Sequence, residues 1–230
     1  MNDDNVLSAI AGYVDTLSFV ALFGLFTAHV TGNFVLIGGG LAGYGQGIFL
    51  KLMAFPAFVL GVALSSLLIR TASPETLARG ACMLYAVQAV LLLAFSIAGI
   101  HLGSTFSPEN WSVVLCGMIG AAAMGVQNAH SRLVARPGVP NTVMTGNVTQ
   151  VILDAIDLCS SRVGIDSKLA SRARVAKMLP AIIAFALGAI AGAFAYAHFG
   201  FWSLLLPVIA LAWLALRSLM QRNALEKRAS

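Results

Sequence analysis

Long uncharged runs of apolar residues dominate the chain and define its class. Several runs reach the roughly 20 residues that an α-helix needs to cross a bilayer core about 30 Å thick. The clearest runs cover 52–69, 81–100, 111–128, 178–197 and 199–216. The pattern predicts an all-α polytopic membrane protein with about six to eight transmembrane or half-membrane helices, and we expect residues 1–230 to form a single membrane domain.

Two further apolar stretches are too long for one straight span, so each is predicted to hold a discontinuous helix. Residues 5–41 contain one carboxylate, one histidine and no basic residue, whereas 111–153 is interrupted by the turn signals Pro137-Gly138 and Pro140. We expect paired helices over about 6–24 with 29–41, and over about 111–132 with 141–157. Irregular backbone at membrane depth occurs only where it is packed in protein or lines a wet cavity. Two breaks at matching positions therefore indicate a transport site.

The two stretches share a short motif, which indicates an internal duplication. The triplet Thr-Gly-Asn occurs at 31–33 and again at 145–147, an offset of 114 residues. Upstream, the segment 12–15 corresponds to 125–128 at an offset of 113. Self-similarity at a nearly fixed offset is typical of transporters that are built from two repeats.

The correspondence continues in the next apolar segment. There Phe58 and Gly61 match Phe185 and Gly188 at an offset of 127, so the second half carries a longer intervening loop. We therefore predict three parts, namely a first repeat over 6–102, a second repeat over 111–216 and a cytoplasmic tail over 217–230.

The basic residues predict the orientation of the chain in the membrane. Lysine and arginine are concentrated in 158–178 and after 216, so both segments are expected in the cytoplasm, and 101–110, which has neither residue, is expected outside. If each discontinuous pair crosses once, the halves are inverted copies and both termini are cytoplasmic, which the charge bias favours. If each pair crosses twice, the halves are parallel and Arg70 and Arg79 face outward.

Composition narrows the partners that the chain can have. Hydrophobic residues make up 59% of the chain and charged residues only 10%, with a mean hydropathy of +0.87, far from the values of a soluble domain. The net charge of +5 comes mainly from the segments expected in the cytoplasm, so it indicates contact with anionic lipids and no nucleic acid. We expect no cofactor and no metal. The expected partners are the lipid bilayer and a small-molecule solute, and the chain length leaves a homodimer open.

Four strings together carry a family resemblance. They are GYVD at 12–15, LFTAHVTGN at 25–33, GVQNA at 125–129 and TGN at 145–147. The chain resembles the YoaK-type family of bacterial inner-membrane proteins from about residue 6 to residue 216. The resemblance implies a multi-pass protein of the bacterial plasma membrane with a suspected role in small-molecule transport, and it implies no substrate.

Two titratable residues in the first stretch are candidates for proton coupling. An ionised carboxylate inside the bilayer costs about a few kcal/mol or more, so Asp15 needs a partner, water or a proton there. Alternatively, Asp15 is a cap or surface anchor near the cytoplasmic end of the first helix. His29 can carry a proton near neutral pH, or it can donate a hydrogen bond that ties the break together.

The two triplets are candidate solute-binding elements. Threonine can cap the following half-helix, glycine permits close approach of the backbone, and asparagine offers a donor and an acceptor. Two half-helix N-termini that approach near the midplane would favour an anion or the carboxylate of a zwitterion. The alternative is that the triplets only allow tight helix packing.

The second half offers further polar residues at corresponding positions. Gln127 and Asn128 stand where Val14 and Asp15 stand in the first half, and Arg132 can bind an anionic solute, pair with a carboxylate or extend to lipid headgroups. The predicted solute-binding residues are His29, Thr31, Gly32, Asn33, Gln127, Asn128, Arg132, Thr145, Gly146 and Asn147. The predicted proton-coupling residues are Asp15 and His29.

These features together favour a secondary transporter of a small polar or anionic solute, with protons as one driving ion. A channel is the first alternative, and it predicts flux without coupling to a proton gradient. An intramembrane enzyme would need a nucleophile and base or a metal set, which the sequence does not contain, so we expect no enzyme. A scaffold without transport would tolerate substitutions at both triplets. The sequence leaves the solute, the direction of transport and the coupling ion open.

Overall fold

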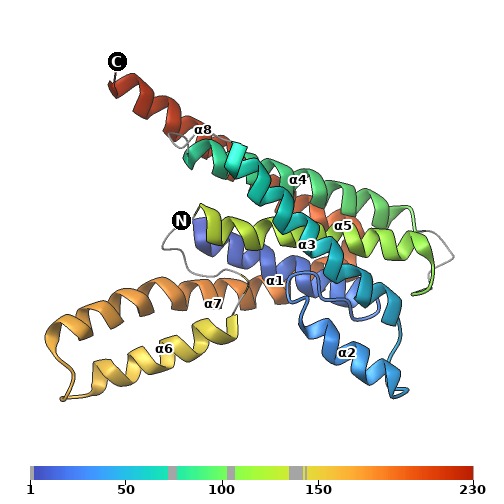
Figure 1. Ribbon diagram of the computed structural model, residues 1–230, viewed down its shortest axis with the longest axis horizontal. Coiled ribbons are helices and arrows are strands. Elements are labelled where there is room, and N and C mark those ends of the chain that lie inside the picture. The colour runs from blue at the N-terminus through green and yellow to red at the C-terminus, as the bar shows by residue number, and fades with distance from the viewer. Residues whose placement is uncertain (1–2, 72–76, 103–106, 135–141, 143, 230) are drawn as a thin grey trace.

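A computed structural model of the chain describes residues 3–71, 77–102, 107–134, 142 and 144–229, and every regular element within them is a helix (Figure 1). In chain order the elements are α1 (Asp3–Ala21), α2 (Gly32–Leu41), α3 (Ile48–Thr71), α4 (Leu77–Ile100), α5 (Trp111–Leu133), α6 (Met144–Cys159), α7 (Ile165–Phe199), the short 3-10 helix η1 (Gly200–Leu204) and α8 (Leu205–Ala229). The predicted all-α fold is confirmed.

Much of the helical surface is suited to a bilayer. The helical stretches that are long and apolar enough to cross it are Ile48–Arg70, Gly80–Ile100, Trp111–Leu133 and Ile165–Met220. Large apolar side chains on α3, α7 and α8, such as Leu60, Leu187 and Ile209, point outward, where lipid tails would cover them. The chain is therefore a polytopic membrane protein, as its hydropathy predicts.

The first predicted break is present in the structure. α1 ends at Ala21 and α2 begins at Gly32, and the residues between them form turns and irregular backbone. In the second half α5 ends at Leu133 and α6 begins at Met144, close to the predicted ends. The turn signals Pro137-Gly138 and Pro140 lie outside the described residues.

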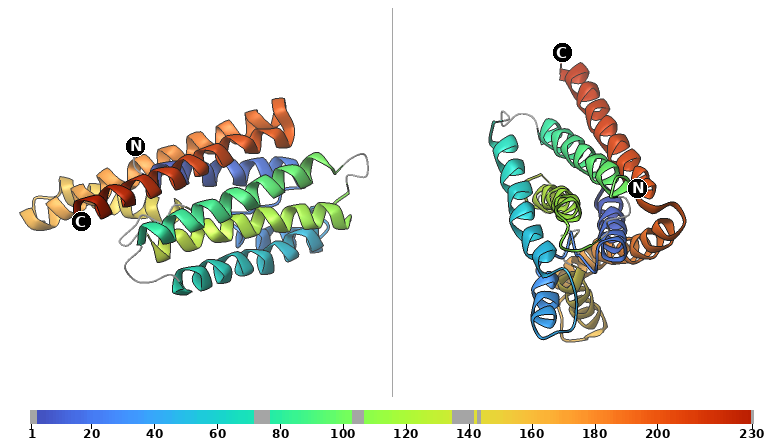
Figure 2. Two further views of the ribbon diagram at one scale, coloured as in Figure 1. Left: turned by 90° about the horizontal axis from the view of Figure 1, so that it is seen from above. Right: turned by 90° about the vertical axis from the view of Figure 1, so that its right-hand side faces the viewer.

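Helices that are far apart in the sequence pack side by side. The two most extensive interfaces join α1 with α7 and α3 with α5, while α4 packs on both α5 and α8 (Figures 1 and 2). The first helix of each predicted repeat thus packs on the long helix that follows the half-helix of the other repeat. A reciprocal exchange of this kind buries both first helices in the centre of the bundle.

Glycines bring the backbones into contact at these two interfaces. A Cβ atom on Gly12 of α1 would collide with the carbonyl oxygen of Phe185 on α7, and a Cβ atom on Gly125 of α5 would collide with that of Phe58 on α3. The sequence comparison had paired the same residues, glycine with glycine and phenylalanine with phenylalanine. The same close contact is made by Gly61 on Ala122 and by Gly188 on Ala9.

α6 and the first turns of α7 form a hairpin that projects from the bundle (Figure 1). α7 has 35 residues, and its length of about 52 Å exceeds the bilayer core of about 30 Å. The guanidinium of Arg174 holds the buried carboxylate of Asp154, with Nε 3.0 Å from Oδ2. These hydrogen bonds lower the pKa of the Asp154 carboxyl, so an ionised side chain joins the two helices.

Candidate functional site

The break after α1 is held by one buried carboxylate. Asp15 is 3% exposed, and its Oδ1 accepts hydrogen bonds from the backbone amides of Thr27 at 2.8 Å and Ala28 at 2.7 Å. The hydroxyl of Ser18 lies 3.0 Å from that of Thr27 and donates to the carbonyl oxygen of Asp15. The alternative of a surface anchor is therefore wrong, because Asp15 lies inside the bundle and binds the irregular segment.

His29 completes the set of groups around this carboxylate. Its Nδ1 lies 2.7 Å from Oδ2 of Asp15, and its side chain is 34% exposed. The edge of the imidazole also meets the ring of Phe185 on α7, at 5.5 Å between ring centroids. The pair therefore joins α1, the break and α7, and the imidazole is its accessible end. Of the two alternatives for His29, the hydrogen bond that ties the break together is present, and the proton-carrying role stays a prediction.

The side-chain amide of Asn33 forms its hydrogen bonds with the backbone of the break. Its Oδ1 accepts from the backbone N–H of Phe26 at 2.9 Å, and its Nδ2 donates to the carbonyl oxygen of the same residue at 2.7 Å. Asn33 is 1% exposed, so this contact is sealed from solvent. Asn33, which was predicted to bind the solute, therefore binds the protein backbone instead.

The first half-helix does not present the open amides that we expected. Thr31 occupies the N-cap position of α2, but its side chain is exposed and makes no capping hydrogen bond, so the predicted cap is wrong. The amide of Gly32 donates to the carbonyl oxygen of His29, and the amides of the next two residues donate to Val30 and Thr31. The turn before α2 satisfies these donors, which removes them from an anion site.

The second half repeats the arrangement around Asp15 with neutral groups. Asn128 corresponds to Asp15, and its Nδ2 donates to Oγ1 of Thr142 at 2.6 Å. Ser131 donates to the carbonyl oxygen of Asn128, as Ser18 does to that of Asp15. The amide keeps the polar contact between α5 and the following segment but carries no charge.

Gln127 links three helices and is closed to a solute. Its side chain is fully buried, accepts from Gln88 on α4 at 2.6 Å, and donates to the carbonyl oxygen of Leu7 on α1 at 2.7 Å. Amides in such a position fix the relative placement of helices in an apolar environment. A structural role accounts for these contacts.

The remaining predicted residues do not gather with the Asp15–His29 pair into one cluster. Thr145, Gly146 and Arg132 are exposed, while Asn147 is buried and its Nδ2 lies 3.8 Å from the sulfur of Met144. In Figure 1, α2 and α6 both begin near the middle of the long axis and end toward opposite ends of the bundle. α2 and α6 are therefore arranged as two half-helices would be. Within the described residues, however, α2 and α6 form no extensive interface with each other.

Lys51 belongs to the site and was missed from the sequence. Lys51 is 4% exposed, and its ammonium group donates to the carbonyl oxygen of Phe23 at 2.7 Å and to that of Gln46. Phe23 follows α1 and has a positive φ of 51°, so the lysine stabilises a strained turn. The available signal was that Lys51 is the only basic residue among the first 69.

No set of three or more metal-ligating side chains occurs in the described part of the chain. At the break the structure brings together the Asp15 carboxylate and the His29 imidazole, which share a hydrogen bond. His130, unlike His29, is a buried imidazole, and it is stacked on Tyr85 at 4.7 Å between ring centroids. Its ring nitrogens find no hydrogen-bond partner among the described residues.

Comparison with known proteins identifies the family. A family model described as a protein of unknown function (DUF1275) matches residues 5–217. The chain is similar to the UPF0700 transmembrane protein YoaK of Bacillus subtilis (strain 168), with 27% identity over 208 residues, which cover 89% of this chain and 88% of that protein. No solved structure matches the chain. The resemblance carried by the motifs is confirmed, and this transmembrane protein belongs to the DUF1275 family.

Proposed function

We propose that this protein is a secondary transporter of a small polar or anionic solute, and that a proton at the Asp15–His29 pair controls the helix break. The observation that carries the proposal is an ionisable pair at a discontinuous helix, a buried carboxylate with a partly exposed imidazole, and Nδ1 of His29 lies 2.7 Å from Oδ2 of Asp15. Ionisable groups at membrane depth cost free energy and are concentrated in solute and proton pathways.

The charge on Asp15 holds the break in its present conformation. As an anion, the carboxylate accepts from the amides of Thr27 and Ala28 and from the imidazole. A proton on the carboxylate removes the charge that strengthens these hydrogen bonds. The segment before α2 is then released from α1, so proton binding is coupled to the conformation of the break.

Only one half of the protein carries a titratable group at this position. Asn128 forms the corresponding contact in the second half without a charge. This asymmetry confines the proposed proton exchange to the break in the first half. The solute then binds near the accessible imidazole of His29. There a polar or anionic group of the solute can replace the Asp15 carboxylate as the hydrogen-bond partner of the imidazole.

We infer that the two halves are inverted repeats, each crossing the membrane three times, with both termini in the cytoplasm of a bacterium. The matched contacts of Gly12 and Gly125 support the repeats. The basic residues of 158–178 and after 216 support the orientation, since cytoplasmic segments carry an excess of lysine and arginine. In this arrangement the chain lies in the plasma membrane as a multi-pass protein.

The test needs a solute first, which a thermal-shift screen of the purified protein against metabolite classes supplies. Uptake is then measured in proteoliposomes with and without an imposed pH gradient. Asp15→Asn should still exchange solute but should lose accumulation against a gradient, because the side chain can no longer release a proton. Asp154→Asn is the matched control, since it neutralises a buried carboxylate away from the break.

Accumulation by Asp15→Asn at the wild-type rate would reject this carboxylate as the coupling group. If the rate of solute flux through the wild-type protein is the same with and without the pH gradient, the protein is a channel instead.

A further inference from the structure

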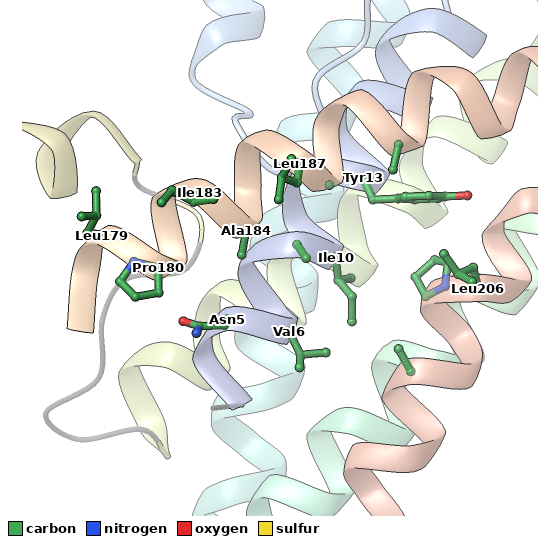
Figure 3. A pocket seen from close by; sticks show the side chains of 15 residues that line it. Asn5, Val6, Ile10, Tyr13, Leu179, Pro180, Ile183, Ala184, Leu187 and Leu206 are labelled. Carbon is green, nitrogen blue, oxygen red and sulfur yellow. The ribbon is translucent and has the colours of Figure 1, made fainter. Parts of the chain in front are cut away.

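A second site lies outside the break, in an apolar groove between α1, α7 and α8 (Figure 3). Its volume of about 690 Å³ is typical of ligand pockets, which measure roughly 300–1,000 Å³. The walls are apolar apart from Asn5 and Tyr13, and the hydroxyl of Tyr13 already donates to the carbonyl oxygen of Ser203 at 2.9 Å. Because large apolar side chains of α7 and α8 are exposed beside the groove, we expect lipid around it.

The groove has the depth of one leaflet. Along α7 its lining extends from Leu179 to Ala191, about 18 Å at 1.5 Å per residue, and half of a bilayer core is about 15 Å. Leu179 lies at the start of the uncharged part of α7, two residues after Lys177. The groove therefore begins at the level where the membrane interface is expected and runs toward the bilayer centre.

Polar groups are gathered at that end of the groove. Asn5 lines it, and the buried Oδ1 of this residue has no hydrogen-bond partner among the described residues. The ammonium of Lys177 lies 4.0 Å from the carboxylate of Asp4, and its side chain is 40% exposed. An occupant must therefore be apolar along most of its length and polar at one end.

The packing of α8 produces the groove. In the first half α4 packs closely along α5, whereas in the second half α8 makes few contacts with α1. The face of α1 that carries Val6 and Ile10 is therefore bordered by α7 and by the more distant α8, and the groove lies between these two helices. Figure 3 shows these side chains directed into the space between the two helices.

We propose that this groove binds one acyl chain of a glycerophospholipid from the leaflet on the side where α1 begins. The phosphate lies near Lys177, and a hydrogen-bond donor of the head group, either the ammonium of phosphatidylethanolamine or a hydroxyl of phosphatidylglycerol, meets Oδ1 of Asn5. This assignment is independent of the transport proposal, since the groove is separate from Asp15 and His29. The bound lipid fills the space between α1 and α8 and fixes their separation.

The experiment uses the full chain in vesicles of phosphatidylethanolamine and phosphatidylglycerol that contain a phospholipid with a photoactivatable acyl chain. Illumination should label Val6 and Ile10, which are 8% and 5% exposed and face the groove. Ala184→Trp, which fills the groove, should reduce this labelling several-fold. Ala186→Trp is the matched control, because Ala186 is exposed on the same helix and does not line the groove.

Leu206→Trp narrows the groove from the α8 side and serves as a second variant should Ala184→Trp fail to fold. Label confined to outward side chains such as Ile190 and Ile209, with none on α1, would overturn the proposal. Dimers trapped by a bifunctional thiol reagent on Leu206→Cys in a variant without the native cysteines, and lost when Ala184→Trp is added, would assign the space to a second copy and would overturn it as well.

Discussion

Polar side chains at the first break mainly satisfy backbone groups. Asn33 pairs with both polar atoms of Phe26, and Lys51 binds the carbonyl oxygens of Phe23 and Gln46. A backbone N–H or carbonyl group without a partner costs several kcal/mol in hydrocarbon. A buried polar side chain that hydrogen-bonds to this group removes most of that cost. A residue type that suits a solute is therefore equally suited to an irregular backbone, whereas Asp15 and His29 also pair with each other.

Asn33→Ala should destabilise the protein by about 1–3 kcal/mol, because it leaves the N–H and carbonyl of Phe26 buried without partners. Unfolding in detergent, followed by circular dichroism, measures the change. Thr31→Ala is the control, since this exposed threonine makes no capping bond; its effect should stay within about 0.5 kcal/mol. Equal stability of both variants would contradict the role assigned to the Asn33 amide.

Between helices, stability depends on the close approach of α1 to α7 and of α5 to α3. At these interfaces the backbones touch at glycines. Lipid tails cover apolar surface as well as large side chains do, so helices in a bilayer associate through such close backbone packing. Because Gly12 and Gly125 make corresponding contacts, the two interfaces should respond alike to the same substitution.

Gly12→Ala and Gly125→Ala should each lower stability by about 1–3 kcal/mol, since the added methyl group forces the helices apart. Thermal unfolding of the purified variants gives the comparison. Gly38→Ala in α2 is the control, because an added Cβ there meets no atom within 4 Å. A large loss in only one of the two interface variants would contradict the equivalence of the two halves.

For the whole molecule, the distribution of charge predicts the side of the membrane on which each loop lies. Cys159 is exposed at the end of α6, next to the basic segment, and Glu109 is exposed in the loop before α5. The inverted arrangement places these two positions on opposite sides. The parallel arrangement would reverse the sides of the loops around α4.

A protein that keeps Cys159 as its only cysteine should resist a membrane-impermeant maleimide in intact cells and react after lysis. With Cys159 replaced and Glu109→Cys introduced, the reagent should label intact cells. Labelling of Cys159 from outside would rule out the proposed orientation.

The helices and the first break could be predicted from the sequence because hydropathy and turn residues act locally. The partners of the polar residues could not. Whether Asn33 binds a solute or Phe26, and whether Asp15 meets His29 or an arginine, depends on how the irregular segment folds back on α1. Lys51 was missed for the same reason, since a lone lysine at a helix start is usually solvated.

The contact of α1 with α7 also sets an order for biogenesis. α1 ends at Ala21 and its partner begins at Ile165, so most of the chain leaves the ribosome before α1 can be covered. α1 is less apolar than the other spans and carries Asp15, and such segments partition weakly into lipid on their own. We therefore expect α1 to be held stably in the bilayer only once α7 is present, and a chain interrupted after α4 to leave α1 without its main partner.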